Sequence, residues 1–326
     1  MLYFSGTNSI HMKVKSVIQN SFKILKDTVK GFSEDKGLKL SASLAYYTIF
    51  SLAPLLLLVI SLAGAFFGKD AIEGSLFSEL KGLLGNEAAA QIQEVIRNME
   101  LSGKTQLSLI IGAIVLIIAA TTVFGDLQDS INMIWKVKAK PKRGWLKLLK
   151  DRLLSGSIII GLGFILVVSL IVNGALSAFN TILKSWLPDT SVIIFSVLSL
   201  LVSFVVLVVI FGVIYKVLPD AKIKWKDVRA GALFTAFLFL LGRYIIGIYI
   251  TSSQAGSPYG AAGSLIVIML WVYYSAAILY ISAEFTRAYA TFKGERIIPA
   301  DYAVYVEETE TEKDNKNIVD ATTSKK

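Results

Sequence analysis

The residue best suited to bind a charged group is Arg243, the one ionised side chain inside an otherwise apolar stretch. It lies fourteen residues beyond Arg229, about 21 Å at the rise of an α-helix. That distance brings it near the middle of a bilayer. Because the apolar stretches hold no Asp or Glu to pair with it, an unpartnered guanidinium there is costly. We expect Arg243 to meet a bound anion such as a lipid phosphate, or, in the alternative, to be a structural arginine bonded to backbone carbonyls or pointing outward.

Hydroxyl and aromatic side chains come to a similar depth in other apolar stretches. Counted inward from Ser264, a Tyr-Tyr-Ser run reaches the level of Arg243. A proline in the first stretch frees the carbonyl of Phe50, which could accept a hydrogen bond from Arg243. The hypothetical substrate-binding set is Arg243, Tyr273, Tyr274, Ser275, Tyr46, Tyr47 and Pro54.

Charged pairs and a glycine-rich turn lie near the ends of the apolar stretches. Asp126 and Asp129 are three residues apart, as are Glu284 and Arg287, so each pair shares a helix face. For the two aspartates, salt bridging with basic loop residues is the plain interpretation and cation binding is the alternative. For Glu284 and Arg287, intrahelical pairing is the plain interpretation and gating is the alternative. The turn before the sixth stretch could be an external gate or a compact loop. The gate or interfacial set is Asp126, Asp129, Pro258, Tyr259, Gly260, Glu284 and Arg287.

The residue types that most enzymes use are missing. The chain has no cysteine and one histidine, His11. That histidine falls in residues 1–11, which resemble the remnant of a tag and cloning junction. We therefore predict no catalytic residues, no metal site, no cofactor and no enzymatic activity. No GxxxxGK[ST] signature occurs, so a transporter of this sequence would depend on an ion gradient, a partner or its substrate's own gradient.

The elements that must position these residues are membrane helices. Of the 326 residues 54% are hydrophobic and 17% charged, with a mean hydropathy of +0.63, too apolar for an ordinary soluble globule. We predict an all-α polytopic fold with six transmembrane helices and short amphipathic interfacial helices. The spans are about 40–67, 107–124, 153–179, 191–215, 230–251 and 264–283. The domains are the 1–11 remnant, an amphipathic 12–39 segment on the membrane surface, a 40–292 transmembrane domain and a polar, disordered 293–326 tail.

The lysines and arginines predict the orientation. Of 33 in the chain, 27 fall in residues 12–39, 125–152, 216–229 and the tail from residue 284, four segments that six spans place on one side. The positive-inside rule makes that side cytoplasmic, so both termini are cytoplasmic. Basic loops that alternate with spans also account for the net charge of +9 without nucleic acid.

Several motifs together resemble the YihY/BrkB family of bacterial inner-membrane proteins. The first two are Ser43-Leu44-Ala45-Tyr46-Tyr47-Thr48 with Pro54, and Phe124-Gly125-Asp126-Leu127-Gln128. The others are Leu218-Pro219-Asp220, Pro258-Tyr259-Gly260-Ala261-Ala262-Gly263-Ser264 and Leu270-Trp271-Val272-Tyr273-Tyr274. The resemblance implies six spans, a bacterial inner-membrane location, a virulence-factor label and proposed transport roles that include lipid export. An older ribonuclease label does not fit, because no cluster of metal-binding residues occurs.

Two function classes remain after these exclusions. The leading hypothesis is a transporter or flippase-like translocator of an amphipathic or anionic substrate, with membrane lipid as one such substrate. The alternative is a noncatalytic membrane scaffold whose basic loops bind anionic lipid or a protein partner. A scaffold should be solidly packed around Arg243, whereas a translocator should have a cavity there. The oligomeric state stays open.

Overall fold

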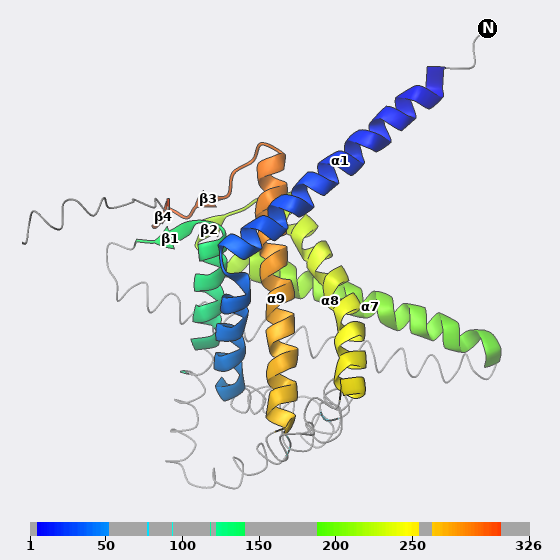
Figure 1. Cartoon of the computed structure of the whole chain (residues 1–326), viewed down its shortest axis with the longest axis vertical. Helices are drawn as coiled ribbons and strands as arrows, with labels where there is room; N and C mark the ends of the chain where they lie inside the picture. Colours follow the sequence, from blue (N-terminus) through cyan, green and yellow to red (C-terminus); the bar gives the residue numbers. More distant parts are fainter. Residues whose placement is uncertain are drawn as a thin grey trace, which may run out of the picture.

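The computed structural model describes residues 5–51, 122–140, 188–253 and 263–307, together with the single positions Phe77, Gln93 and Ile118. Within these ranges the chain is mostly helical, and its long helices are α1 (Ser5–Glu34), α7 (Pro188–Val217), α8 (Trp225–Ser253) and α9 (Gly263–Phe292). Two further helical segments cover residues 37–51 and 122–134. Figure 1 shows α1 crossing the end of α9.

Three of these helices are long and apolar enough to cross a membrane: Ser196–Val217, Trp225–Ile246 and Leu265–Phe292. A helix of 22 residues is about 33 Å long, which matches the hydrocarbon core of a bilayer. They correspond to the fourth, fifth and sixth predicted spans. Of the other predicted spans, the first begins in the described 37–51 segment, while nearly all of 107–124 and the whole of 153–179 lie outside the described residues.

Apolar helices of this kind need not bury all of their surface. Helix α8 packs against α7 on one side and α9 on the other. Among its described side chains, α7 contributes Phe211, Ile214 and Tyr215 of its last turns to the core, whereas Ile193 and Val197 nearer its start are exposed. In water such exposure would be unfavourable, but lipid is as apolar as these side chains.

The amphipathic segment predicted at 12–39 is a helix with a sharp end. Helix α1 runs to Glu34, and a turn at residues 35–36 separates it from the 37–51 segment. Lys36 adopts a left-handed backbone conformation, with φ of 55°, that breaks the helix. The predicted amphipathic segment therefore consists of most of α1, a turn, and the start of the 37–51 helix. Residues 5–11, which the sequence assigns to a tag remnant, form the first turns of α1.

Two small antiparallel sheets tie the start of the tail to the bundle. Strand β1 (Val137–Ala139) pairs with β4 (Ala303–Tyr305), and β2 (Ala221–Lys222) pairs with β3 (Ile298–Pro299). The prediction that residues from 293 onward are disordered is therefore wrong as far as residue 307. These residues are held because their backbone groups find partners in the two basic loops. Residues 308–326 lie outside the described part.

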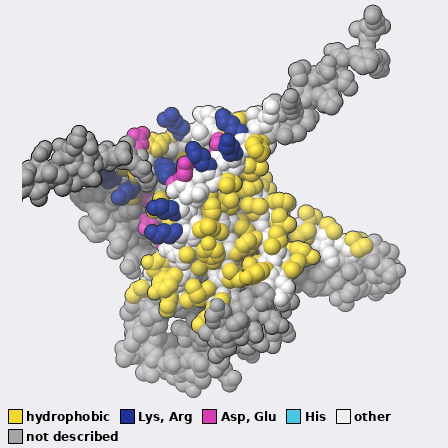
Figure 2. All heavy atoms as spheres, viewed as in Figure 1, with side chains coloured by type: hydrophobic (Ala, Val, Ile, Leu, Met, Phe, Trp, Pro, Cys, Tyr) yellow, Lys and Arg dark blue, Asp and Glu magenta, His cyan; other side chains and the backbone are white. Residues whose placement is uncertain are grey.

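The four segments rich in lysine and arginine meet at one end of the molecule. We call this the basic end and define it as α1 with its following turn, residues 122–140, the connection from α7 to α8, and residues 284–307. Lys136 pairs with Asp35, and the two sheets join the 125–152 and 216–229 loops to the tail. Charged side chains gather there, while apolar side chains cover the face beyond it (Figure 2). The structure thus places together the segments that the charge pattern assigned to one side.

Candidate functional site

Arg243 lies on the side of α8 that faces the bundle, yet its side chain is exposed. It continues a row spaced three or four residues apart in which Ala232 and Ala236 are buried and Phe239 half-buried. Ile246, three residues further on, is buried again. Arg243 is therefore open at a position whose helical neighbours are packed. Among the described residues, no carboxylate forms an ion pair with it.

In the structure, Tyr274 of the Tyr-Tyr-Ser run contacts Gly242, the residue next to Arg243. The Tyr274 hydroxyl of α9 rests on Gly242 of α8, so closely that a Cβ built on Gly242 would lie 1.0 Å from it. Tyr273 is half-buried, and the Ser275 hydroxyl donates to the Trp271 carbonyl at 2.8 Å. Gly242 thus lets α9 approach α8 beside Arg243 and sets Tyr274 at the same level.

The remaining candidate binding residues lie elsewhere. Tyr46 and Tyr47 are exposed in the 37–51 segment, with ring centroids 5.6 Å apart. Tyr46 also packs against Phe50 at 5.0 Å. Pro54 lies outside the described residues, and so do Pro258, Tyr259 and Gly260 of the external turn. Among the described residues, no hydrogen bond or ring contact joins Tyr46 or Tyr47 to Arg243.

Asp126 is a half-buried acceptor at the basic end. Ser43 donates a hydrogen bond to its Oδ1 at 2.7 Å, which links two of the motif segments. Among the described residues this hydroxyl is the hydrogen-bond partner of Asp126; most of the basic loop predicted to pair with Asp126 and Asp129 lies outside the described residues, so the salt bridge stays a prediction. Burial raises the pKa of the Asp126 carboxyl above its ordinary value, and the nearby charge of Asp129 raises it further, against a lowering by Ser43. Asp129 itself is exposed.

Glu284 and Arg287 form the intrahelical pair that their spacing predicted, and they belong to a larger network. Arg287 Nη2 lies 2.8 Å from Glu284 Oε2, and Arg287 Nη1 lies 3.6 Å from Asp35 Oδ2. Lys136 pairs with the other oxygen of Asp35. The carboxyl side chains of Glu284 and Asp35 are only 1% and 5% exposed. Two buried acids held by two bases from different segments fix α1 against α9.

Sequence reasoning missed further polar contacts of the basic end. Asn132 and Asp220 bond each other twice, at 2.8 Å each. Trp135 donates its indole N–H to the Ala283 carbonyl at 3.1 Å, and the buried Tyr215 hydroxyl donates to the Leu279 carbonyl at 2.8 Å. The Leu218-Pro219-Asp220 motif was the signal for Asp220, although nothing in the sequence named its partner.

Two polar features stand out among the described residues. Within these residues, no group of three His, Cys, Asp or Glu side chains is arranged to hold a metal ion. What they offer is an open arginine on an apolar helix and a charged network at the basic end. These features, with three helices able to span a bilayer, define the class as a helical integral membrane protein.

The chain belongs to the virulence factor BrkB family, whose sequence model matches residues 28–300. Relatives named UPF0761 membrane protein are similar over most of its length. One from Vibrio atlanticus is 25% identical over 292 residues, 86% of each chain. One from Vibrio parahaemolyticus is 26% identical over 294 residues, 86% of this chain and 87% of the relative. One from Stenotrophomonas maltophilia is 26% identical over 283 residues, covering 84% of this chain and 63% of the relative. No solved structure matches the chain. The resemblance that the motifs indicated is confirmed.

Proposed function

We propose that this membrane protein is a translocator of an anionic or amphipathic substrate, with membrane lipid as the leading class and Arg243 as the residue that meets its negative group. The observation that carries this proposal is an arginine that lies in a packed row of α8 and is nevertheless open. A scaffold with a solid interior has no reason to keep a charge at such a position.

The energetic argument starts from the cost of the charge. An arginine at the centre of a membrane helix is unfavourable by a few kcal/mol, about 2.5–3.5 on insertion scales, unless its donors are satisfied. The guanidinium has five N–H donors in a planar fork, which suits the oxygens of a phosphate or carboxylate. A substrate that brings such oxygens into the bundle offsets part of the cost of the arginine while it is bound.

The surroundings of Arg243 suit an amphipathic molecule. Tyr274 brings a hydroxyl to the same level from α9. Phe239, one turn before Arg243, packs edge to face on Trp271, with ring centroids 5.9 Å apart. A polar centre beside aromatic walls accommodates a charged group joined to an apolar body.

The proposed orientation places the basic end in the cytoplasm of a bacterial cell with the protein in the inner membrane. The gathering of the basic segments at one end supports this under the positive-inside rule. In the described part no acidic side chain shares the level of Arg243, so coupling to protons at that level is not the first mechanism to test.

The test is movement of fluorescent lipid in proteoliposomes that hold the purified full chain. Wild type is compared with Arg243→Ala, with Arg243→Lys, and with Arg229→Ala, an exposed arginine at the opposite end of α8. Reconstitution is matched and folding is checked beforehand. We expect wild type and Arg229→Ala to move anionic lipid faster than protein-free vesicles. Arg243→Ala should lose about tenfold or more of that rate, since a hydrogen bond to a charged group is worth about 1.5–3 kcal/mol and tenfold corresponds to about 1.4 kcal/mol.

Two outcomes would overturn the proposal. One is no movement above protein-free vesicles for any of several anionic lipids, which leaves small-solute transport or the scaffold as the better explanation. The other is movement that Arg243→Ala does not slow. Arg243→Lys distinguishes a need for charge alone from a need for the planar fork.

A further inference from the structure

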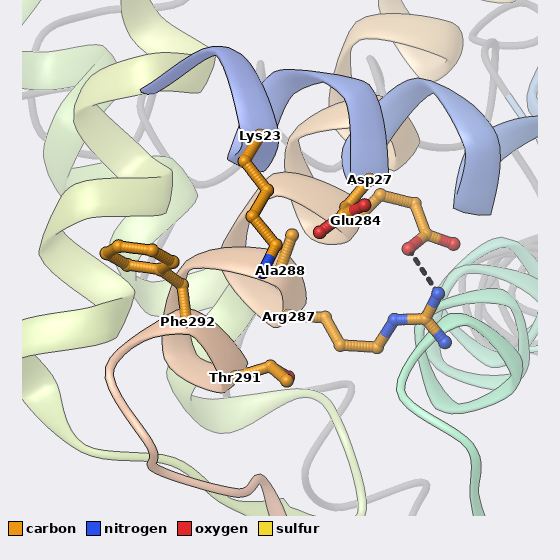
Figure 3. Close-up of a pocket in the computed structure, with 7 residues that line it drawn as sticks. All are labelled: Lys23, Asp27, Glu284, Arg287, Ala288, Thr291 and Phe292. Atoms are coloured by element: carbon orange, nitrogen blue, oxygen red, sulfur yellow. Dashed lines mark ion pairs between the residues drawn. The ribbon is translucent and has the colours of Figure 1, made fainter. Parts of the chain in front are cut away.

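A cavity of about 520 Å³ lies between α1 and the last turns of α9 at the basic end. Its polar lining comes from Lys23 and Asp27 of α1 and from Glu284, Arg287 and Thr291 of α9, with Phe292 at its edge. In Figure 3 Lys23 reaches from α1 toward α9, and Asp27 and Glu284 lie near each other across the gap. Two helices far apart in the sequence thus build one polar hollow.

The cavity is lined by two basic and two acidic side chains, and two of these four form no ion pair with a described residue. Lys23 and Arg287 are basic, and Asp27 and Glu284 are acidic. Among the described residues, neither Lys23 nor Asp27 forms an ion pair, and both side chains are exposed. Glu284 is buried, its Oε2 is held by Arg287, and its carboxyl also lies within hydrogen-bonding reach of the Asp35 carboxyl. Two buried carboxyls so close together favour a cationic donor near them.

We propose that this cavity binds the headgroup of a zwitterionic phospholipid, with the phosphate toward Lys23 and Arg287 and the ammonium toward Glu284 and Asp27. The primary ammonium of an ethanolamine headgroup fits best, because it can donate up to three hydrogen bonds to the acidic side of the cavity, where Asp27 and Glu284 lie.

The balance of charge distinguishes this ligand from a simple anion. Lys23 and Asp27 are one helical turn apart on α1, so any group near one also feels the other. A bare phosphate held by Lys23 and Arg287 would lie beside the carboxyls of Asp27 and Glu284 and would compete with Glu284 for Arg287. A headgroup that carries a phosphate and an ammonium a few bonds apart can place each charge next to lining side chains of the opposite sign.

The cavity is also placed where a lipid headgroup would be. Phe292 at its edge is exposed, and so are Phe22 and Leu25, which lie within two residues of Lys23 in the sequence of α1. Figure 2 shows the charged side chains of the basic end next to a broad apolar face. Acyl chains can cover these apolar side chains while the headgroup enters the polar hollow.

This site is separate from Arg243. Tyr274, which marks the level of Arg243, and Glu284 are ten residues apart on α9, or about 15 Å along the helix. Headgroup binding at the basic end does not require that the protein translocate anything. Its test therefore measures binding, and the result does not depend on the outcome of the transport assay.

The experiment is calorimetric titration of the purified full chain in a non-ionic detergent. The ligands are short-chain phosphatidylethanolamine, short-chain phosphatidylglycerol and inorganic phosphate. The variants are Lys23→Gln and Asp27→Asn, both at exposed positions of α1 where folding should be retained. Their matched controls are Lys26→Gln and Glu34→Gln, which are exposed on the same helix and do not line the cavity.

We expect wild type to bind phosphatidylethanolamine about tenfold more tightly than phosphatidylglycerol. Lys23→Gln and Asp27→Asn should each weaken phosphatidylethanolamine binding about fivefold or more, and Asp27→Asn should narrow the preference between the two lipids. The controls should bind as wild type does. Equal or tighter binding of phosphatidylglycerol would overturn the proposal. Inorganic phosphate binding as tightly as the lipid would also overturn it, and so would cavity variants that match their controls.

Discussion

Asn132 and Asp220 hold each other by two reciprocal hydrogen bonds across 88 residues of sequence. The Asn132 amide donates to Asp220 Oδ2 at 2.8 Å, and the Asp220 backbone N–H donates to Asn132 Oδ1 at 2.8 Å. Both side chains are buried. The contact joins the 122–140 segment to the connection between α7 and α8, two of the four segments that form the basic end.

The first prediction concerns this contact. Asn132→Ala should lower the free energy of unfolding by about 1–3 kcal/mol, because it leaves a buried backbone N–H and a buried carboxylate without their partners. The measurement is the apparent melting temperature of the purified protein in detergent. Asp301→Asn, which breaks an ion pair with Lys222 that is exposed on both sides, is the control and should change little. A melting temperature of Asn132→Ala equal to that of the control would contradict the prediction.

The second prediction tests whether the start of the tail is part of the core. Ile297 is 7% exposed and belongs to the core cluster, while its neighbour Ile298 in β3 is 56% exposed. Ile297→Ala should cost about 2–5 kcal/mol of unfolding free energy, as other buried isoleucines do. Ile298→Ala should cost under about 1 kcal/mol, the span of strand preferences. Thermal unfolding of the two variants side by side checks this, and equal effects would mean that residues 295–307 are not docked as the structure has them.

The third prediction follows from the raised pKa of Asp126. The folded carboxyl binds protons more tightly than the unfolded one, whose pKa is near the ordinary value of 3.8. Folding stability therefore falls as pH rises from about that value through the folded pKa, and the full penalty is present above it. The neutral Asp126→Asn carries no such penalty. Its stability relative to wild type should be greatest at neutral pH and should decline as pH falls toward 4.

The test is to measure the melting temperatures of wild type and Asp126→Asn across pH 4 to 8 and to compare the difference between the two proteins at each pH. Asp129→Asn is a useful companion, since it keeps the Asp126 carboxyl but removes the charge that raises its pKa. The melting temperature of Asp129→Asn relative to wild type should also be highest at neutral pH, by a smaller amount than that of Asp126→Asn. A difference between wild type and Asp126→Asn that stays constant with pH would refute the prediction.

The sequence could predict the helices and the segments that carry the basic side chains because both depend on local information. Runs of apolar residues give the three helices α7, α8 and α9, and counts of lysine and arginine per loop give the segments that meet at the basic end. The intrahelical pair of Glu284 and Arg287 was likewise predictable, because three residues along a helix is a fixed geometry.

The contacts between segments could not be predicted in the same way. Ser43 and Asp126 belong to motifs that carried the family resemblance, but nothing in a single sequence says that one donates to the other. Asn132 lies outside every motif. The sequence therefore marked Asp220 as a motif residue but did not identify its hydrogen-bond partner. The short strands β3 and β4 escaped notice because a two- or three-residue ladder in a polar tail has no periodicity to detect.

The fourth prediction concerns the docking of α1 on α9. A Cβ added to Gly31 would lie 2.6 Å from Glu284 Oε2 and 2.8 Å from Arg287 Nη2. Gly31→Ala should therefore push the ion pair away from α1 and loosen this helix, although alanine is the better helix former. Hydrogen exchange of residues 19–34 should become faster than in wild type. Ser33→Ala, at an exposed position of α1, should not change the exchange, and protection in Gly31→Ala equal to wild type would show that α1 is held without this contact.

The fifth prediction isolates the contact of Gly242 with Tyr274, which sets the spacing of α8 and α9 beside Arg243. Gly242→Ala should destabilise the protein by about 1–3 kcal/mol, the usual cost of overpacking, because its new Cβ would overlap the Tyr274 ring. Tyr274→Ala removes that obstacle at the cost of its own packing. In the Tyr274→Ala background, Gly242→Ala should have little effect, so the two substitutions should be strongly non-additive. Strict additivity of the two melting-temperature changes would mean that the helices do not meet at this point. In that case Tyr274 would also lose its place at the level of Arg243.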